Sequence, residues 1–233
     1  MMPDLSFEVI DAYVPPYAAV PQLVFKLRVT NDIAGERLHS ISLRSQIQIA
    51  VTRRRYTPDA QARLKELFGE PKRWGDTLHP LLWTHASTNV RSFEGSVVAD
   101  LPVTCTYDFE IASTKYFDAL ADGEIPLSFL FSGTIFYEND EGMLQVEQIP
   151  WSKEALYRLP VSTWKSVIER YYPNSAWIRL HKDQFDQLYR YKIAHSLPTW
   201  EDVISQLLQS SDHSESVLRA TNGRSEAVSG EEG

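Results

Sequence analysis

In the first 160 residues, apolar and polar side chains alternate over short stretches, the pattern of β-strands that bury one face. The clearest stretch covers residues 22–30, and its apolar positions are Leu23, Phe25, Leu27 and Val29. Other alternating or apolar stretches are residues 5–9, 41–51, 81–85, 96–101, 103–111, 125–137, 144–149 and 155–159. With turn residues between them, these stretches predict about eight or nine short strands in two packed antiparallel sheets.

Helical signals appear at one insertion in this region and again after residue 160. In the insertion, residues 57–77, Thr57 suits a helix N-cap, Pro58 the first helical position and Gly69 the C-terminal stop. After residue 160, apolar positions recur at helical spacing, and Thr199 with Asp202 three residues later resembles a capping box. The prediction is a mainly β (α+β) fold: an antiparallel β-sandwich over 1–160 with the inserted helix, helices over 161–208 packed on the sandwich, and a disordered tail over 209–233, where Ser, Glu and Gly dominate.

Composition narrows the function classes. A formal net charge of −8 argues against nucleic-acid binding, which needs a basic face. The single cysteine, Cys105, excludes an intrachain disulfide and paired-cysteine metal sites. The N-terminus lacks the pattern of a signal peptide, and the apolar stretches are too short for a membrane-spanning helix. We expect a soluble cytoplasmic protein.

We find no motif that predicts catalysis, a metal or a cofactor. No two of the six histidines have the i, i+4 spacing of a helical zinc pair, and neither a G-x-S-x-G elbow nor a Gly-rich phosphate loop occurs. We therefore expect no catalytic residue, no metal site and no cofactor. The open alternative is an enzyme or small-molecule-binding site assembled from distant strands, with candidates His79, His85, Asp108 and Cys105.

Two features suggest a surface for a protein partner. Arg53, Arg54 and Arg55 form the densest basic cluster, which suits an acidic partner but is also typical of a solvated strand end. The chain has six tryptophans, several of them beside prolines or turns. Such aromatic residues anchor interfaces, although they also fill cores between a sheet and its helices. The candidate partner-binding tryptophans are Trp74, Trp83, Trp151 and Trp177.

Six segments resemble an uncharacterised bacterial family of conserved hypothetical proteins. They are PDLSFEV at the start, LFGEPKRWG at 67–75, LLWTHAS at 81–87, CTYDFE at 105–110, PLSFLFSGTIFY at 126–137 and QIPWSKEALYRLPVSTWKSVIERYYPNSAWIRL at 148–180. The resemblance covers nearly the whole chain up to about Leu208. Genes of that family often lie among the accessory genes of nickel–iron hydrogenases, which implies a helper role in maturation, assembly or scaffolding. It names no catalytic residue.

Two hypotheses follow. The first is a non-enzymatic accessory protein that binds a protein partner, such as a hydrogenase subunit or maturation factor, through aromatic loops and the region Arg53–Arg55. The second is the enzyme or small-molecule site, which requires its candidate side chains to converge in one pocket.

Overall fold

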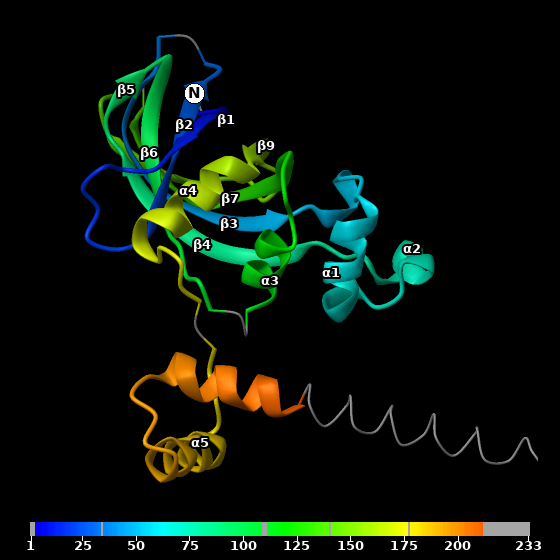
Figure 1. Cartoon of the computed structure of the whole chain (residues 1–233). Coiled ribbons are helices and arrows are strands. Elements are labelled where there is room, and N and C mark those ends of the chain that lie inside the picture. The colour runs from blue at the N-terminus through cyan, green and yellow to red at the C-terminus, as the bar shows by residue number, and fades with distance from the viewer. Residues whose placement is uncertain (1–2, 34, 109–110, 140, 177, 212–233) are drawn as a thin grey trace, which may run out of the picture. The chain divides into compact units, whose positions relative to one another are not determined.

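The structure is a computed structural model that describes residues 3–33, 35–108, 111–139, 141–176 and 178–211 (Figure 1). The chain divides into two compact units, Met1–Ile178 and Arg179–Gly233. Among the described residues, no helix combines the length and the apolar character needed to cross a membrane.

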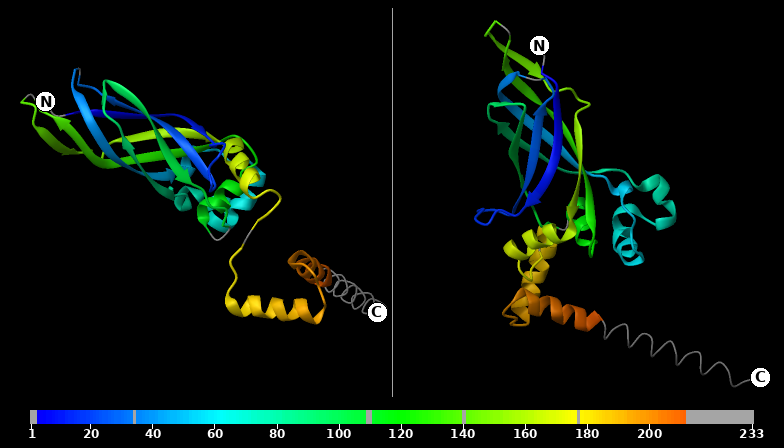
Figure 2. Two further views of the ribbon diagram at one scale, coloured as in Figure 1. Left: turned by 90° about the vertical axis from the view of Figure 1, so that its left-hand side faces the viewer. Right: turned by 90° about the horizontal axis from the view of Figure 1, so that it is seen from above.

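The first unit contains two antiparallel sheets, which confirms the predicted sandwich-like α+β fold. Its strands are β1 (Leu5–Tyr13), β2 (Gln22–Asn31), β3 (Arg37–Ile49), β4 (Leu81–Val90), β5 (Phe93–Glu94), β6 (Ser96–Thr104), β7 (Glu124–Glu138), β8 (Leu144–Gln148) and β9 (Glu154–Pro160). Sheet A has the order β1-β2-β6. Sheet B has the order β4-β3-β7-β8, while β5 pairs with β3 and β9 with β7. At the edges, β6 lies beside β4 and β1 beside β9, so the two sheets are stacked as layers (Figures 1 and 2).

The inner faces of both sheets form the core. Leu23, Phe25, Leu27 and Val29 of β2 are all fully buried, as their alternation predicted. Between the layers, the rings of Phe7 and Phe131 stack with centroids 4.4 Å apart, and the rings of Phe25 and Phe129 meet edge to face at 5.0 Å. Burial of these large side chains supplies the main driving force for folding.

The helices of the first unit lie at one end of the sandwich, and the β7–β8 hairpin lies at the other (Figure 2). These helices are η1 (Val51–Arg53), α1 (Pro58–Phe68), η2 (Pro71–Arg73), α2 (Trp74–Thr77), α3 (Ala112–Asp118) and α4 (Val161–Tyr171). The ends of α1 are as predicted, because Thr57 Oγ1 accepts a hydrogen bond from Ala60 N–H and Gly69 follows with a φ of 71°. The inserted helix therefore has local start and stop signals, while its buried face of Ala60, Leu64 and Phe68 packs into the common core.

The second unit contains α5 (Lys182–Ala194) and a helical segment over 200–211. The latter begins with a capping box, in which Asp202 N–H donates to Thr199 Oγ1 (3.1 Å) and Thr199 N–H donates to Asp202 Oδ2 (3.2 Å). The Trp200 ring packs against Phe185 with centroids 5.3 Å apart.

Three element boundaries of the structure lie elsewhere than the sequence patterns alone indicate. The alternation over 103–111 predicts a strand, but β6 ends at Thr104 and α3 begins at Ala112. The helix α4, expected with the C-terminal helices over 161–208 that pack on the sandwich, lies within the first unit, and the boundary between the two units follows Ile178. Of the tail expected from residue 209, residues 209–211 are still helical and 212–233 lie outside the described residues. The packing of the later helices on the sandwich stays a prediction.

Candidate functional site

The arginine cluster divides into one internal and two surface side chains. The Arg54 guanidinium donates to the carbonyl oxygens of Asp122 (Nη2, 2.6 Å) and Glu124 (Nη1), which lie between α3 and β7 and at the start of β7. Arg54 therefore ties η1 to this turn and serves the fold. Arg53 and Arg55 are exposed and accessible to a partner.

The four candidate tryptophans also occupy different environments. Trp74 is buried, and its Nε1–H donates to the carbonyl of Gly69 (3.0 Å). Trp83 is partly buried and meets Phe117 edge to face at 5.1 Å. Trp74 therefore packs α2 against the end of α1, while Trp83 of β4 holds α3 against sheet B. Trp151 is 91% exposed, and Trp177 lies outside the described residues.

The two groups of exposed candidates lie on separate parts of the first unit. The turn that carries Trp151 is tied to the middle of β7, because Phe131 N–H donates to the carbonyl of Lys153 (2.9 Å). Arg54 is tied to Glu124 at the start of that strand. Seven residues of strand separate positions 124 and 131, a span of about 23 Å at ~3.3 Å per residue. Trp151 and the arginine cluster therefore do not form one continuous patch.

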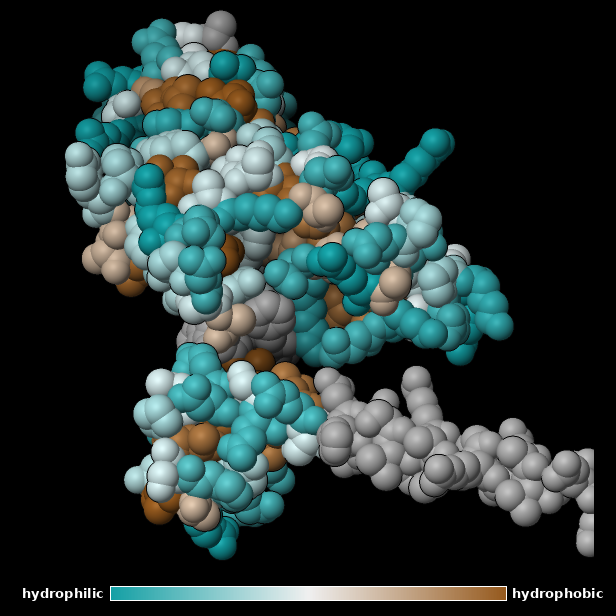
Figure 3. Space-filling view, in the orientation of Figure 1, coloured by the Kyte–Doolittle hydropathy of each residue, from teal (hydrophilic) through white to brown (hydrophobic). Residues whose placement is uncertain are grey.

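Just before Trp151 in the chain, the structure has an apolar edge that was not predicted from the sequence. In sheet B, β8 lies at the end of the strand order and pairs with β7. The ladder runs from Thr134 opposite Gln148 to Glu138 opposite Leu144. Its side chains Leu144 and Val146 are 63% and 56% exposed, and Met143 just before them is also exposed. We call Met143, Leu144, Val146 and Trp151 the β8 surface. It is a row of exposed apolar side chains along the edge, which extends from the Trp151 turn, tied to Phe131, to Leu144, opposite Glu138, about 23 Å at ~3.3 Å per residue. In Figure 3 most of the visible surface of the first unit is hydrophilic, with apolar residues in separate small patches.

The geometry of β8 explains why this edge was missed. Leu144 and Val146 alternate with Gln145 and Glu147, which from sequence alone fits a strand whose apolar face is buried. In the structure, Val146 lies opposite Phe136 on β7, on the outer face of sheet B. Only the pairing with β7 shows that the apolar side faces outward.

The candidates for an assembled catalytic site are not gathered in one place. Cys105 is buried on the core side, where desolvation raises the pKa of its thiol to about 12, so the thiol stays protonated near neutral pH. His85 is exposed on the outer face of sheet B, and His79 is exposed in the segment before β4. Asp108 is partly buried in the segment between β6 and α3. The described residues contain no group of three or more His, Cys, Asp or Glu side chains that could hold a metal ion.

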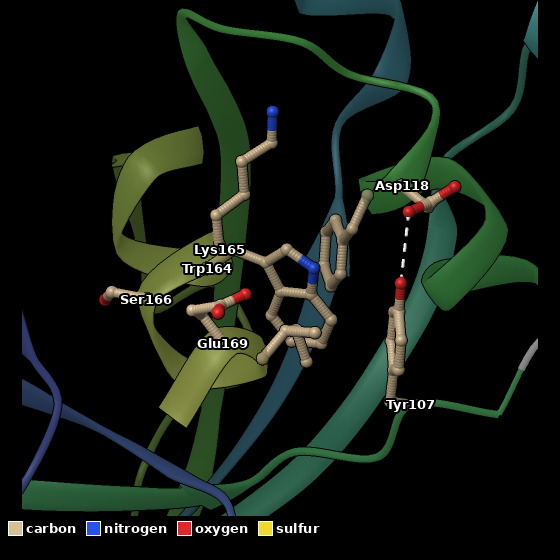
Figure 4. A pocket seen from close by; sticks show the side chains of 8 residues that line it. Tyr107, Asp118, Trp164, Lys165, Ser166 and Glu169 are labelled. Atoms are coloured by element: carbon tan, nitrogen blue, oxygen red, sulfur yellow. Dashed lines mark hydrogen bonds between the residues drawn. The ribbon is translucent and has the colours of Figure 1, made fainter. Parts of the chain in front are cut away.

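One hollow of about 400 Å³ lies between α3 and α4 (Figure 4). Its apolar side is formed by Trp164 of α4 and Phe117 of α3, whose ring centroids are 4.5 Å apart. Tyr107 donates to Asp118 (3.3 Å), and desolvation, followed by the nearby Asp118 carboxylate, raises the pKa of Tyr107.

The polar groups of this hollow fix α3 and its connection to α4: Tyr107 binds the end of α3 from the segment before it, and Lys165 of α4 binds a residue that follows it. Besides the bond from Tyr107, Lys165 Nζ donates to the carbonyl of Ala121 (2.6 Å). Figure 4 shows the Lys165 side chain extending away from the Trp164 indole. The hydroxyl of Tyr107 and the ammonium of Lys165 already donate to Asp118, which ends α3, and to Ala121, which follows it. The hollow is therefore best explained as the junction of α3 with α4.

Comparison with known proteins places the chain in a family. A family model described as "Family of unknown function (DUF6084)" matches residues 2–216. The chain belongs to this family. For this DUF6084 member, no curated protein sequence gives a match.

Two solved structures share a distant likeness with this DUF6084 protein. One is the CARDB domain of a Pyrococcus furiosus protein, described as a complex with di-metal ions, at 13% identity and a TM-score of 0.26, covering 68% of this chain and 92% of the other. The second is a β-glucosidase from Kluyveromyces marxianus, at 8% identity and a TM-score of 0.20, covering 67% of this chain and 15% of the other. Neither likeness carries a functional argument.

Proposed function

We propose that this protein is a non-enzymatic accessory protein of the cytoplasm that binds a protein partner through the β8 surface. The observation that carries the proposal is Trp151, a tryptophan 91% exposed beside an edge strand with three further exposed apolar side chains. Tryptophan is the residue most enriched among interface anchors, and clustered exposed apolar side chains mark interaction sites.

The energetics favour burial of this surface by a partner. A tryptophan side chain covers roughly 200 Å², so its burial contributes about 5 kcal/mol at ~25 cal/mol per Å² before the costs of association. The edge of β8 adds backbone N–H and C=O groups that can pair with an extended strand of a partner. Anchor and edge together provide affinity and register.

The family resemblance suggests which partners to test first. Nickel–iron hydrogenase subunits and maturation factors are the candidates, and the assembly role is part of this proposal. The exposed Arg53 and Arg55 lie on a separate region and serve as a second contact site only if the partner extends along the length of β7.

The proposal can be tested by photo-crosslinking in the native host. A photoreactive phenylalanine analogue replaces Trp151 in one strain and Tyr17 in the control strain, because Tyr17 is also an aromatic residue on the surface (97% exposed) but lies between β1 and β2. We expect one defined protein adduct from position 151 and none from position 17. The Val146→Lys variant should abolish the adduct, because it places a charge within the apolar contact.

The outcomes separate the two parts of the proposal. A Val146-dependent adduct with a hydrogenase subunit or maturation factor supports both parts. A Val146-dependent adduct with a different protein supports partner binding and rules out the hydrogenase role. Absence of any adduct specific to position 151, with the protein folded and expressed, would refute the β8 surface as a binding site.

A further inference from the structure

A second hollow, of about 500 Å³, lies on the outer face of sheet B, away from the junction of α3 and α4. Its lining residues come from β4, β3 and β7. These strands are neighbours in sheet B (Figure 1). In this part of the sheet, Ser45 of β3 is paired with Ala86 of β4, and both side chains are buried toward the core. The alternation of each strand therefore places their neighbours, among them Arg44, on the solvent side.

Arg44 lies at the centre of this hollow with a hydroxyl on each side. It is directly opposite Ser87 on β4 and Ser132 on β7. The next outward-facing pair is Gln46 with His85. All five side chains are hydrogen-bond donors, and among the described residues that line the hollow none is acidic.

The charge environment of Arg44 differs from that of the other basic residues on strands. Lys26 of β2 pairs with Asp100, Arg28 of β2 with Glu8, and Arg158 of β9 with Glu124. The remaining strand arginine, Arg37, donates to Ser92 Oγ (3.1 Å). Within the described part of the chain, Arg44 has neither an ion pair nor a hydrogen bond with a protein group.

The local backbone adds to this arrangement. Ser132 precedes Gly133, whose missing side chain lets β7 approach the backbone of Ser42 on β3 closely. This approach holds Ser132 and Arg44 in register on adjacent strands. The guanidinium and the flanking hydroxyls are therefore presented from rigid paired strands, which reduces the entropy lost when a ligand binds.

We propose that this hollow binds a small oxyanion, a carboxylate or a phosphate group, with Arg44 as the charged anchor. A guanidinium presents two parallel N–H donors that match the oxygens of either group, and Ser87 and Ser132 can donate to the remaining oxygens. The site is independent of the β8 surface.

The test is an NMR titration of the full chain at constant ionic strength. Sodium phosphate replaces sodium chloride in one series, and sodium acetate replaces it in the other. The probes are the Arg44 side-chain N–H and the backbone amides of Ser87 and Ser132. We expect saturable shifts in at least one series, with a dissociation constant on the order of 1–10 mM for such an open site. The two series distinguish a phosphate site from a carboxylate site.

Matched variants decide whether Arg44 is the anchor. Arg44→Gln should weaken binding at least tenfold, Ser132→Ala several-fold, and the exposed control Arg55→Gln should leave it unchanged. Because Arg44 is exposed, the variant should keep the amide spectrum of the folded protein, which serves as the check on folding. The proposal is overturned if neither anion gives saturable shifts, or if the shifts persist in Arg44→Gln.

Discussion

Gly133 is the position where a single methyl group should damage the sandwich most. A Cβ atom at this residue would lie 2.1 Å from the carbonyl oxygen of Ser42 and 3.2 Å from the Cα of Leu43. Both contacts are with the backbone of β3, so a change of side-chain rotamer cannot relieve the clash. The φ of Gly133 is 144°, a conformation that residues with a Cβ rarely adopt.

The cost of Gly133→Ala has two parts. Overpacking against a rigid backbone costs about 1–3 kcal/mol, and the unfavourable φ adds a further 1–3 kcal/mol. The sum, about 2–6 kcal/mol, is a large share of the 5–15 kcal/mol typical of whole proteins. In a unit of this size it corresponds to a fall of roughly 5–20 °C in the melting temperature.

The stability of Gly133→Ala is measured by thermal and urea unfolding, monitored by circular dichroism. Two other glycines provide control variants. Gly95 has a φ of 68° but open space around its Cβ position, so Gly95→Ala should cost only the left-handed conformation, about 1–2 kcal/mol. Gly75, in α2, has open space and no positive φ, so Gly75→Ala should be neutral or slightly stabilising. If Gly133→Ala were no more destabilising than Gly95→Ala, the close approach of β7 to β3 would not be a real constraint.

Three further predictions concern buried groups. Trp164→Ala should cost about 3–5 kcal/mol, because this 2% exposed ring packs on Phe117; an unchanged urea midpoint would mean that α4 is detachable. The Cys105 thiol should react with a thiol reagent at pH 8 only after unfolding. Burial raises the pKa of the Cys105 thiol from 9.0 to about 12, so the unfolded protein loses this proton at a lower pH than the folded protein. As the pH rises from 9 to 12, the free energy of unfolding should therefore fall by about 1.4 kcal/mol per pH unit, and Cys105→Ala should reduce this slope. Ser45→Ala should stabilise by about 1 kcal/mol, measured in urea, because within the described structure the buried Ser45 Oγ has no hydrogen-bond partner; a loss of stability would point to a partner for this hydroxyl.

The residues of the candidate sites show where sequence reasoning stopped. Aromatic content and nearby turns mark Trp74, Trp83 and Trp151 alike, yet Trp74 is buried, Trp83 is partly buried against the core and only Trp151 is fully on the surface. Likewise, the run of three arginines does not reveal that Arg54 binds the carbonyls beside β7. Whether such a side chain is buried or exposed depends on its contacts with segments that are distant in sequence.

A failed strand prediction has the same origin. Between Val103 and Ile111 the alternation correctly indicates that Cys105 and Tyr107 are buried, but β6 ends at Thr104. The reason is its partner: the ladder with β2 begins at Gln22, opposite Thr104, and the residue before Gln22 is a proline. A strand needs a neighbour to accept and donate its hydrogen bonds, and alternation does not report where that neighbour ends.

The sequence by itself determined the properties that depend on neighbouring residues: the buried face of β2, the ends of α1, the capping box at Thr199 and the mainly β class. These are local because strand and helix periodicities and capping bonds act over a few residues. Only the tertiary structure decided the outward face of β8 and the setting of Arg44 between Ser87 and Ser132. Both arise from the register between strands that are distant in sequence, and register is set by the packing of the whole core.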